Sequence, residues 1–399
     1  YLQAIYFFPK IELMTDILQQ QRIVNVLHQR AHDLLLGHSF ANQQIGFIHT
    51  LDLNDGKPVK NRTLLEVEVA AQQKRQQKST SHQKLQAKTS QKLHTVIETV
   101  MAKRLEDIDS VIKDTIGIDD NVPAILDILA TRAASVGRLE PLINDLNWLG
   151  RELVTLVNLP FYRKQRSKST SVKVDTPALA LRYVGLDNLQ LVVPTFCVRH
   201  WMPHSTAPFP LLKRRLKDNT MSCAIAAQTL AQLNGVNPMH AFTLGMLLNV
   251  GQIALVRLYL KVFDQVWQRK VQRAREEGDK NLHTALLELK PDPLFLTTLL
   301  NEKSLLVSAK VIESMSFKYL PFDSVMQQLV NGVAKGDSLL PLAQVILKAR
   351  CYSQYLNLKE HQLIEDDELQ SWFSYYQFTK KELDTLQTGN FTNLALQID

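Results

Sequence analysis

Residues 216–251, LKDNTMSCAIAAQTLAQLNGVNPMHAFTLGMLLNVG, decide how the rest of the chain is interpreted. Small and aliphatic residues recur at helical spacing in the first half of this stretch and mark one buried helical face. The Asn-Gly pair at 234–235 ends that helix, because both residues tolerate positive φ, and Asn-Pro at 237–238 begins the next one. The second helix carries no charged residue over 241–250, so we expect it at the centre of the core.

The segments LKDNT at 216–220 and GMLLNVG at 245–251 resemble two patterns of the HDOD family, the regulatory branch of the HD phosphohydrolase superfamily. Those patterns are L-W-x-H-S and G-L-L-H-D/N-I/L-G, and their frame of glycines and aliphatic residues is kept. The metal-ligand positions differ. Asn219 and Leu248 stand where the family has histidine, and Asn249 stands where it has aspartate.

The resemblance continues on both sides of this stretch. Residues 143–158 keep the aliphatics and the asparagine of the family's upstream segment, although Leu-Asn replaces its Asp-Pro. Residues 180–185 resemble A-I-x-x-L-G, and residues 308–321 resemble the later G-A-x-L-L…W-x-L-P helix. The similarity covers about residues 121–330 and implies a two-lobed, all-helical domain that acts in signal transduction.

The composition of the whole chain indicates its fold class and cellular compartment. With 399 residues, 45% of them hydrophobic and only 14 glycines, the chain is predicted to be globular and rich in helix. Three dispersed cysteines favour a reducing cytoplasm, and no apolar run is long enough to predict a membrane span. Tyr1 is neither a methionine nor part of a basic leader, which predicts a trimmed or incomplete N-terminus rather than a signal peptide.

Residues 1–70 are predicted to form a small α+β module. A strand is expected at 2–8, a helix over 11–36 that stops at Gly37, and a hairpin over 45–69 that turns at Asp-Gly. Residues 71–120 are predicted as a basic, Gln/Lys-rich linker followed by an amphipathic connector helix over 93–112.

The linker carries the main charge asymmetry of a chain whose net charge is +7. Over residues 69–99 one acid, Glu98, faces six basic residues that could form an interaction surface: Lys74, Arg75, Lys78, Lys84, Lys88 and Lys92. We expect a solvated helix or a flexible tether here. Binding of nucleic acid is the less favoured alternative, because the run lacks the interleaved aromatics used for base stacking.

From residue 121 onward the pattern is helix after helix, assigned to an HDOD-like domain at 121–335 and a C-terminal helical extension at 336–399. Thr379 and Glu382 have the spacing of a capping box. The expected helices cover residues 123–134, 139–145, 148–157, 176–184, 187–200, 217–233, 238–249, 252–272, 280–290, 292–300, 305–316, 322–333, 341–358 and 366–378.

An HD hydrolase uses histidine and aspartate to hold a divalent metal and to lower the pKa of its bound water. Leu248 cannot coordinate a metal, and the neutral amides of Asn219 and Asn249 are poor substitutes. We therefore expect no metal, no cofactor and no catalytic residue. These positions should pack as ordinary core, the alternative being an altered pocket that binds a small polar ligand.

Other candidate groups have simpler interpretations. His28 and His32-Asp33 share a helix face but lack the HD frame, so a solvated polar face is expected. His200 and His204 have the same spacing, but Pro203 and Pro208 make that segment a loop, so no metal role is expected. Cys197 and Cys223 are expected to be buried, inert thiols.

Taken together, the sequence predicts a mainly α, cytoplasmic, bacterial-type signalling protein. Its HDOD-like domain would be non-catalytic and would bind protein partners, with the N-terminal module as input or docking unit. Two alternatives stay open: a metal-dependent phosphohydrolase acting on nucleotides, and a protein that associates with nucleic acid through the basic linker.

Overall fold

The computed structural model describes residues 8–45, 66–165, 173–332, 339–394 and 396, and each regular element among them is a helix. The mainly α fold is therefore confirmed. The elements, in chain order, are α1 (Phe8–Leu36), α2 (His38–Ile45), α3 (Glu66–Glu106), α4 (Ile108–Ser110), the π-helical turn η1 (Val111–Ile116), α5 (Asn121–Leu129), α6 (Val136–Asp145), α7 (Asn147–Val157), α8 (Pro160–Gln165), α9 (Pro177–Val184), α10 (Leu186–Trp201), α11 (Leu212–Leu233), α12 (Pro238–Leu247), α13 (Val250–Glu276), α14 (Lys280–Leu287), α15 (Pro293–Ser314), α16 (Phe322–Val330), α17 (Pro341–Glu360), α18 (Asp366–Tyr375) and α19 (Lys380–Gln387).

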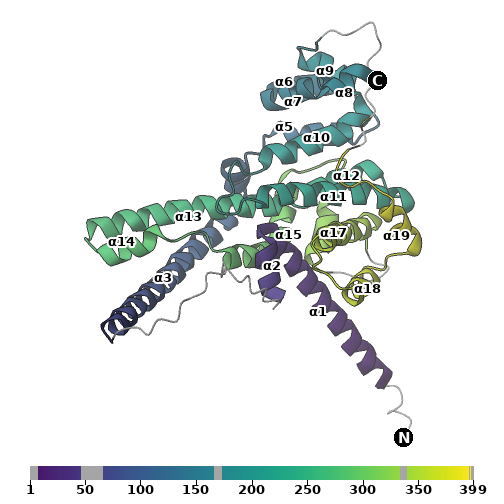
Figure 1. Cartoon of the computed structure of the whole chain (residues 1–399). Coiled ribbons are helices and arrows are strands. Elements are labelled where there is room, and N and C mark those ends of the chain that lie inside the picture. Colours follow the sequence, from purple (N-terminus) through teal and green to yellow (C-terminus); the bar gives the residue numbers. More distant parts are fainter. Residues whose placement is uncertain (1–7, 46–65, 166–172, 333–338, 395, 397–399) are drawn as a thin grey trace.

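Helices α11, α12 and α13 form the centre of the molecule. Helix α11 packs along both α12 and α17, and α13 packs along α15. Helices α5–α10 make a lobe at the top of the view in Figure 1, while α3, α14 and the far half of α13 project to the left as an arm. Helix α1 crosses below the centre and contacts α15, α17 and α18, so the first helix of the chain joins its C-terminal part.

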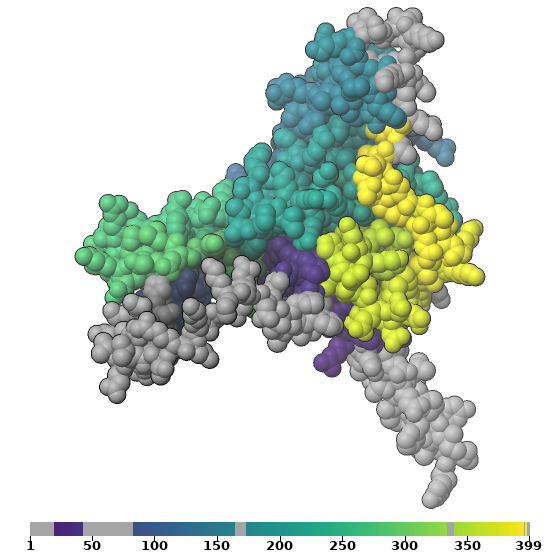
Figure 2. Space-filling view, in the orientation of Figure 1, coloured from purple at the N-terminus to yellow at the C-terminus, as the bar shows by residue number. Residues whose placement is uncertain are grey.

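The uncharged stretch around residue 245 occupies the core, as predicted. The helical run Pro238–Glu276 is long and apolar enough to cross a membrane, but 94% of its apolar window is buried inside the protein. Burial of that kind is typical of a core helix. The space-filling view in Figure 2 shows the lobe above the central segment and the C-terminal helices to its right.

The N-terminal module needs correction. The helix expected at 11–36 is present as α1, and Gly37 lies just after it. The predicted strand at 2–8 and most of the hairpin lie outside the described residues. Residues 66–69, expected in the second hairpin strand, begin helix α3 instead, which continues without a break through the basic run. Their apolar-polar alternation is followed directly by good helix formers, with no glycine or proline to stop the helix.

Two further details concern the C-terminal half. Separate helices were expected at 292–300 and 305–316, but α15 is one helix, because residues 301–304 contain no helix breaker. The predicted capping box is confirmed. The Thr379 side chain accepts from the Glu382 backbone N–H, and the Glu382 carboxylate accepts from the Thr379 backbone N–H.

Candidate functional site

The turn between α12 and α13 is built on two glycines that let neighbouring helices approach closely. A Cβ atom added at Gly245 would lie 2.7 Å from the Cα atom of Ala224 on α11. A Cβ atom added at Gly251 would lie 2.1 Å from the carbonyl oxygen of Ser304 on α15. Both distances are shorter than any real contact, so the glycine frame of GMLLNVG reflects close helix packing on two sides of the turn.

A single serine hydroxyl fixes the same turn. The backbone N–H of Gly251 donates to Ser308 Oγ at 2.9 Å, and Ser308 Oγ donates to the carbonyl oxygen of Leu248 at 2.6 Å. These bonds satisfy an N–H at the start of α13 and a carbonyl at the end of α12, groups that helix ends leave without an intrahelical partner.

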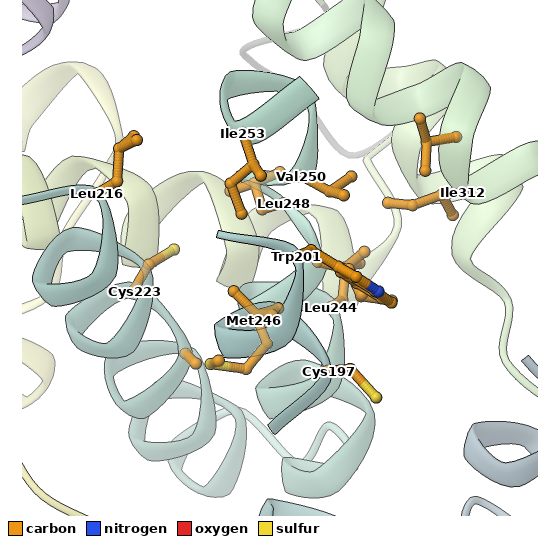
Figure 3. Close-up of a cluster of buried hydrophobic side chains, with 14 of the residues drawn as sticks. Cys197, Trp201, Leu216, Cys223, Leu244, Met246, Leu248, Val250, Ile253 and Ile312 are labelled. Carbon is orange, nitrogen blue, oxygen red and sulfur yellow. The ribbon is translucent and has the colours of Figure 1, made fainter. Parts of the chain in front are cut away.

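Asn219, Leu248 and Asn249, which the sequence predicts to stand at the family's metal-ligand positions, are all buried. Asn249 Nδ2 donates to Thr220 Oγ1 at 3.3 Å, and Asn357 Nδ2 on α17 donates to Asn219 Oδ1 at 3.2 Å. The structure thus brings Asn249 to the turn of α11 that carries Asn219. The Leu248 side chain instead lies in one apolar cluster with Val250 and Ile253 (Figure 3).

This set of side chains does not fit a divalent metal. Two neutral amides are engaged with neutral partners, and an alkyl group takes the third position. Among the residues that the structure describes, no group of three or more His, Cys, Asp or Glu side chains is placed to hold a metal ion. The side chains at these three positions offer hydrogen-bonding amides and an alkyl group.

Helix α1 lies directly against the site. His32 Nε2 is 3.2 Å from the side-chain nitrogen of Gln252, which follows Asn249 in the first turn of α13. His28 lies between Gln354 Oε1, 2.6 Å from its Nδ1, and the Tyr376 hydroxyl, 2.8 Å from its Nε2.

The prediction that this face of α1 is solvated is therefore wrong. The exposed fractions of His32 and Asp33 are 1% and 2%. Apolar positions at 24, 27, 31, 34 and 35 pack on both sides of the polar face, and every residue from 30 to 36 is buried. The partners come from helices more than two hundred residues away, and spacing within residues 8–36 could not show them.

Burial controls the charge of these groups. It lowers the pKa of His32 to about 3, and the positive charge of Arg350 acts in the same direction. The pKa of His28 is also held well below its usual range, chiefly by burial. Burial raises the pKa of Asp33 to about 6, while a contact with Thr297 acts in the opposite direction. At neutral pH the two histidines are therefore uncharged.

Little free space remains between α1 and the degenerate site. The cavity there has a volume of about 10 Å³, close to the minimum that holds one water molecule. Nearby, His32 Nδ1, Asp33 Oδ1 and Gln252 Oε1 are buried without a hydrogen-bond partner among the described residues. The cavity is lined by Ala31, His32, Leu34, Leu35, Arg215, Asn219, Gln354, Asn357 and His361.

Gln252, Gln354 and Asn357 are site residues that the sequence did not single out. Residues 350, 354, 357 and 361 do form a polar stripe at helical spacing along and just beyond α17, which is a readable signal for a polar face. That stripe resembles a solvated face until α1 and α11 are seen to pack on it.

The remaining candidates lie apart from this site. The His200 ring stacks on Trp148, with ring centroids 4.1 Å apart. Cys197 and Cys223 are free and buried, and burial raises the pKa of both thiols. All six basic residues of the predicted linker lie on α3; the side chains of Lys84, Lys88 and Lys92 are exposed, and those of Lys74, Arg75 and Lys78 are outside the described set.

Comparison with known proteins gives a family match and a structural alignment. Residues 118–290 match the family model of the HDOD domain. The chain also aligns with a solved structure from Shewanella amazonensis SB2B, described as a metal-dependent phosphohydrolase, at 12% identity and a TM-score of 0.36, over 74% of this chain and 99% of that one. A TM-score at that level carries no argument about function. No curated protein matches the chain. Residues 118–290 are therefore an HDOD domain.

Proposed function

We propose that this protein is a non-catalytic regulator that acts in a signalling pathway by binding a protein partner, in the cytoplasm of a bacterial-type cell. One observation carries the proposal. Helix α1 encloses the degenerate HD site, with His32 against Gln252, while Asn219, Leu248 and Asn249 stand at the ligand positions. Among the described residues, the free space beside this site is about 10 Å³, too small for a nucleotide, and no group of three His, Cys, Asp or Glu side chains is placed to hold a metal.

Metal content and hydrolysis test the non-catalytic part. Purified protein, incubated with manganese or iron and then desalted, should retain no stoichiometric metal and should hydrolyse a generic phosphodiester no faster than buffer. The matched variant Asn249→Ala should behave identically in both measurements. Tight metal binding or hydrolysis that Asn249→Ala abolishes would show that the protein is a metal-dependent phosphohydrolase instead.

Binding measurements test the regulatory part. A protein captured from the native cell should bind the purified chain in calorimetry, and that binding should persist in a chelator, because no metal takes part. Strict dependence of the complex on a divalent metal would contradict the proposal, and so would the failure of any captured protein to bind the purified chain.

A further inference from the structure

The arm contains a groove that the degenerate site does not use. It lies where α3, α13 and α14 pack together, on the left of Figure 1, and has a volume of about 550 Å³. That volume lies within the range of small-molecule sites in proteins. The groove is lined by Leu85, Lys88, Thr89, Lys92, Leu93, Lys270, Asp279, Asn281, Leu282 and Leu286.

The floor of the groove is aliphatic and firmly held. Leu93 and Leu286 are buried, and Leu85 and Leu282 are half-buried beside them. The indole N–H of Trp267 donates to the carbonyl oxygen of Leu286 at 2.7 Å and fixes the end of α14 against α13. No aromatic residue lines the groove, so it offers no platform for stacking a nucleic-acid base.

The rim of the groove is positively charged. Lys88 and Lys92 lie one helical turn apart on α3, and Lys270 faces them from α13. All three are exposed, and none forms an ion pair within the part of the chain that the structure describes. Asp279 is the one acidic residue among the described residues that line the groove, and its Oδ1 accepts from the Leu282 backbone N–H at 3.0 Å.

Three ammonium groups and one carboxylate line the apolar hollow, so the described lining residues carry a net positive charge. Concave, low-dielectric walls focus the resulting potential and raise the local concentration of anions. A simple inorganic anion would pair with the lysine side chains at the rim but would leave the leucine side chains of the floor in contact with water. An anion that also carries an aliphatic body would satisfy both.

We propose that the groove binds a small phosphorylated aliphatic molecule, free in solution. Its phosphate lies among Lys88, Lys92 and Lys270, and its hydrocarbon chain lies along Leu85 and Leu282. The site is separate from the degenerate HD site, so the inference goes beyond the proposed regulatory role and does not depend on it. The lysines singled out in the sequence as a linker surface then supply part of a ligand site.

Calorimetry with butyl, hexyl and octyl phosphate tests the proposal on the full chain. Burial of each methylene is worth roughly 0.8 kcal/mol, which corresponds to about a fourfold gain in affinity, so affinity should rise by about twofold to fourfold for each added carbon. Lys92→Gln should weaken octyl phosphate binding about tenfold through the loss of one charge-assisted contact. Lys103→Gln, an equal charge change on the same helix outside the groove, should leave binding unchanged.

Other results overturn the proposal. Inorganic phosphate that binds as tightly as octyl phosphate, or an affinity that does not depend on chain length, would exclude the aliphatic part. Equal losses in Lys92→Gln and Lys103→Gln would show diffuse surface charge in place of a site. ATP binding more tightly than octyl phosphate would assign the groove to nucleotides. Binding to phosphatidic acid vesicles that excess octyl phosphate does not displace would assign the face to a membrane.

Discussion

Substitution of Gly251 by alanine tests the packing logic of the site most directly. The new methyl group would lie 2.1 Å from the carbonyl oxygen of Ser304 and 2.6 Å from the backbone nitrogen of Ser308. Both atoms belong to the backbone of α15, so no side chain can rotate away. Helix α13 or α15 would have to move by about 1 Å or more to restore a normal contact.

The magnitude follows from three contributions. Overpacking of a close helix contact costs about 1–3 kcal/mol, and more when only backbone can yield. Separation of the helices also weakens the bonds that join Ser308 Oγ to Gly251 and Leu248, each worth about 1 kcal/mol. Alanine regains up to about 1 kcal/mol through its higher helix propensity. We expect Gly251→Ala to lower the free energy of unfolding by about 3 kcal/mol.

Urea unfolding followed by far-UV circular dichroism measures this loss. The matched control is Gly137→Ala, since Gly137 also lies inside a helix but an added Cβ meets nothing within 4 Å. The control should be at least as stable as wild type, with a gain below the roughly 0.5–1 kcal/mol typical of a glycine in the middle of a helix, because Gly137 lies in the first turn of α6. If Gly251→Ala leaves the unfolding midpoint as high as Gly137→Ala does, the close approach of α13 and α15 is not present in solution.

Three further outcomes are expected. Leu248→Ala should lower the free energy of unfolding by about 2–5 kcal/mol in thermal or urea melts, and Leu248→His should also destabilise without restoring metal binding. The pKa of Asp33 is raised to about 6, so ionisation of its carboxyl group lowers the free energy of unfolding as the pH rises from 4 through 6. Asp33→Asn should therefore raise the free energy of unfolding relative to wild type at pH 8 but not at pH 3.5. Glu382→Ala should lower the free energy of unfolding by about 3–5 kcal/mol in the same melts. The Lys348 ammonium is largely buried, and the substitution removes the carboxylate that pairs with it at 2.8 Å.

Local features were predictable where short-range chemistry decides them. The uncharged run over 241–250 correctly predicted a central helix. The glycines at 245 and 251 entered the sequence analysis only as part of a family pattern, and the structure shows that both lie at close helix contacts. Asn237-Pro238 correctly placed the start of α12, where the Asn237 side chain accepts from the Met239 and His240 backbone N–H groups. Helix caps and core periodicity act over a few residues, so one sequence contains them in full.

The surroundings of α1 could not be read in the same way. The face of α1 that carries His28, His32 and Asp33 resembles a solvated polar face in sequence. Polar residues on one face of a helix recur every three or four positions whether that face is exposed or buried. Its partners lie far away along the chain: Gln252 is 220 residues from His32, and Gln354 is 326 residues from His28. Only the packed fold brings these positions together, and no rule of local spacing predicts which distant helix is chosen.

The polar character of that face argues that α1 is held in one defined position. Apolar residues would fill the same space at lower cost, since His32 Nδ1 and Asp33 Oδ1 are buried without hydrogen-bond partners among the described residues. The polar groups restrict α1 to one arrangement, because His28 has its hydrogen-bond partner Gln354 only in that arrangement. Arg30 stabilises the same position of α1 by a bidentate ion pair with Glu368 on α18, at 2.7 and 2.9 Å. Any molecule that is to reach Asn219 through the cavity must therefore first displace α1, and the energy of these contacts sets how strongly it must bind.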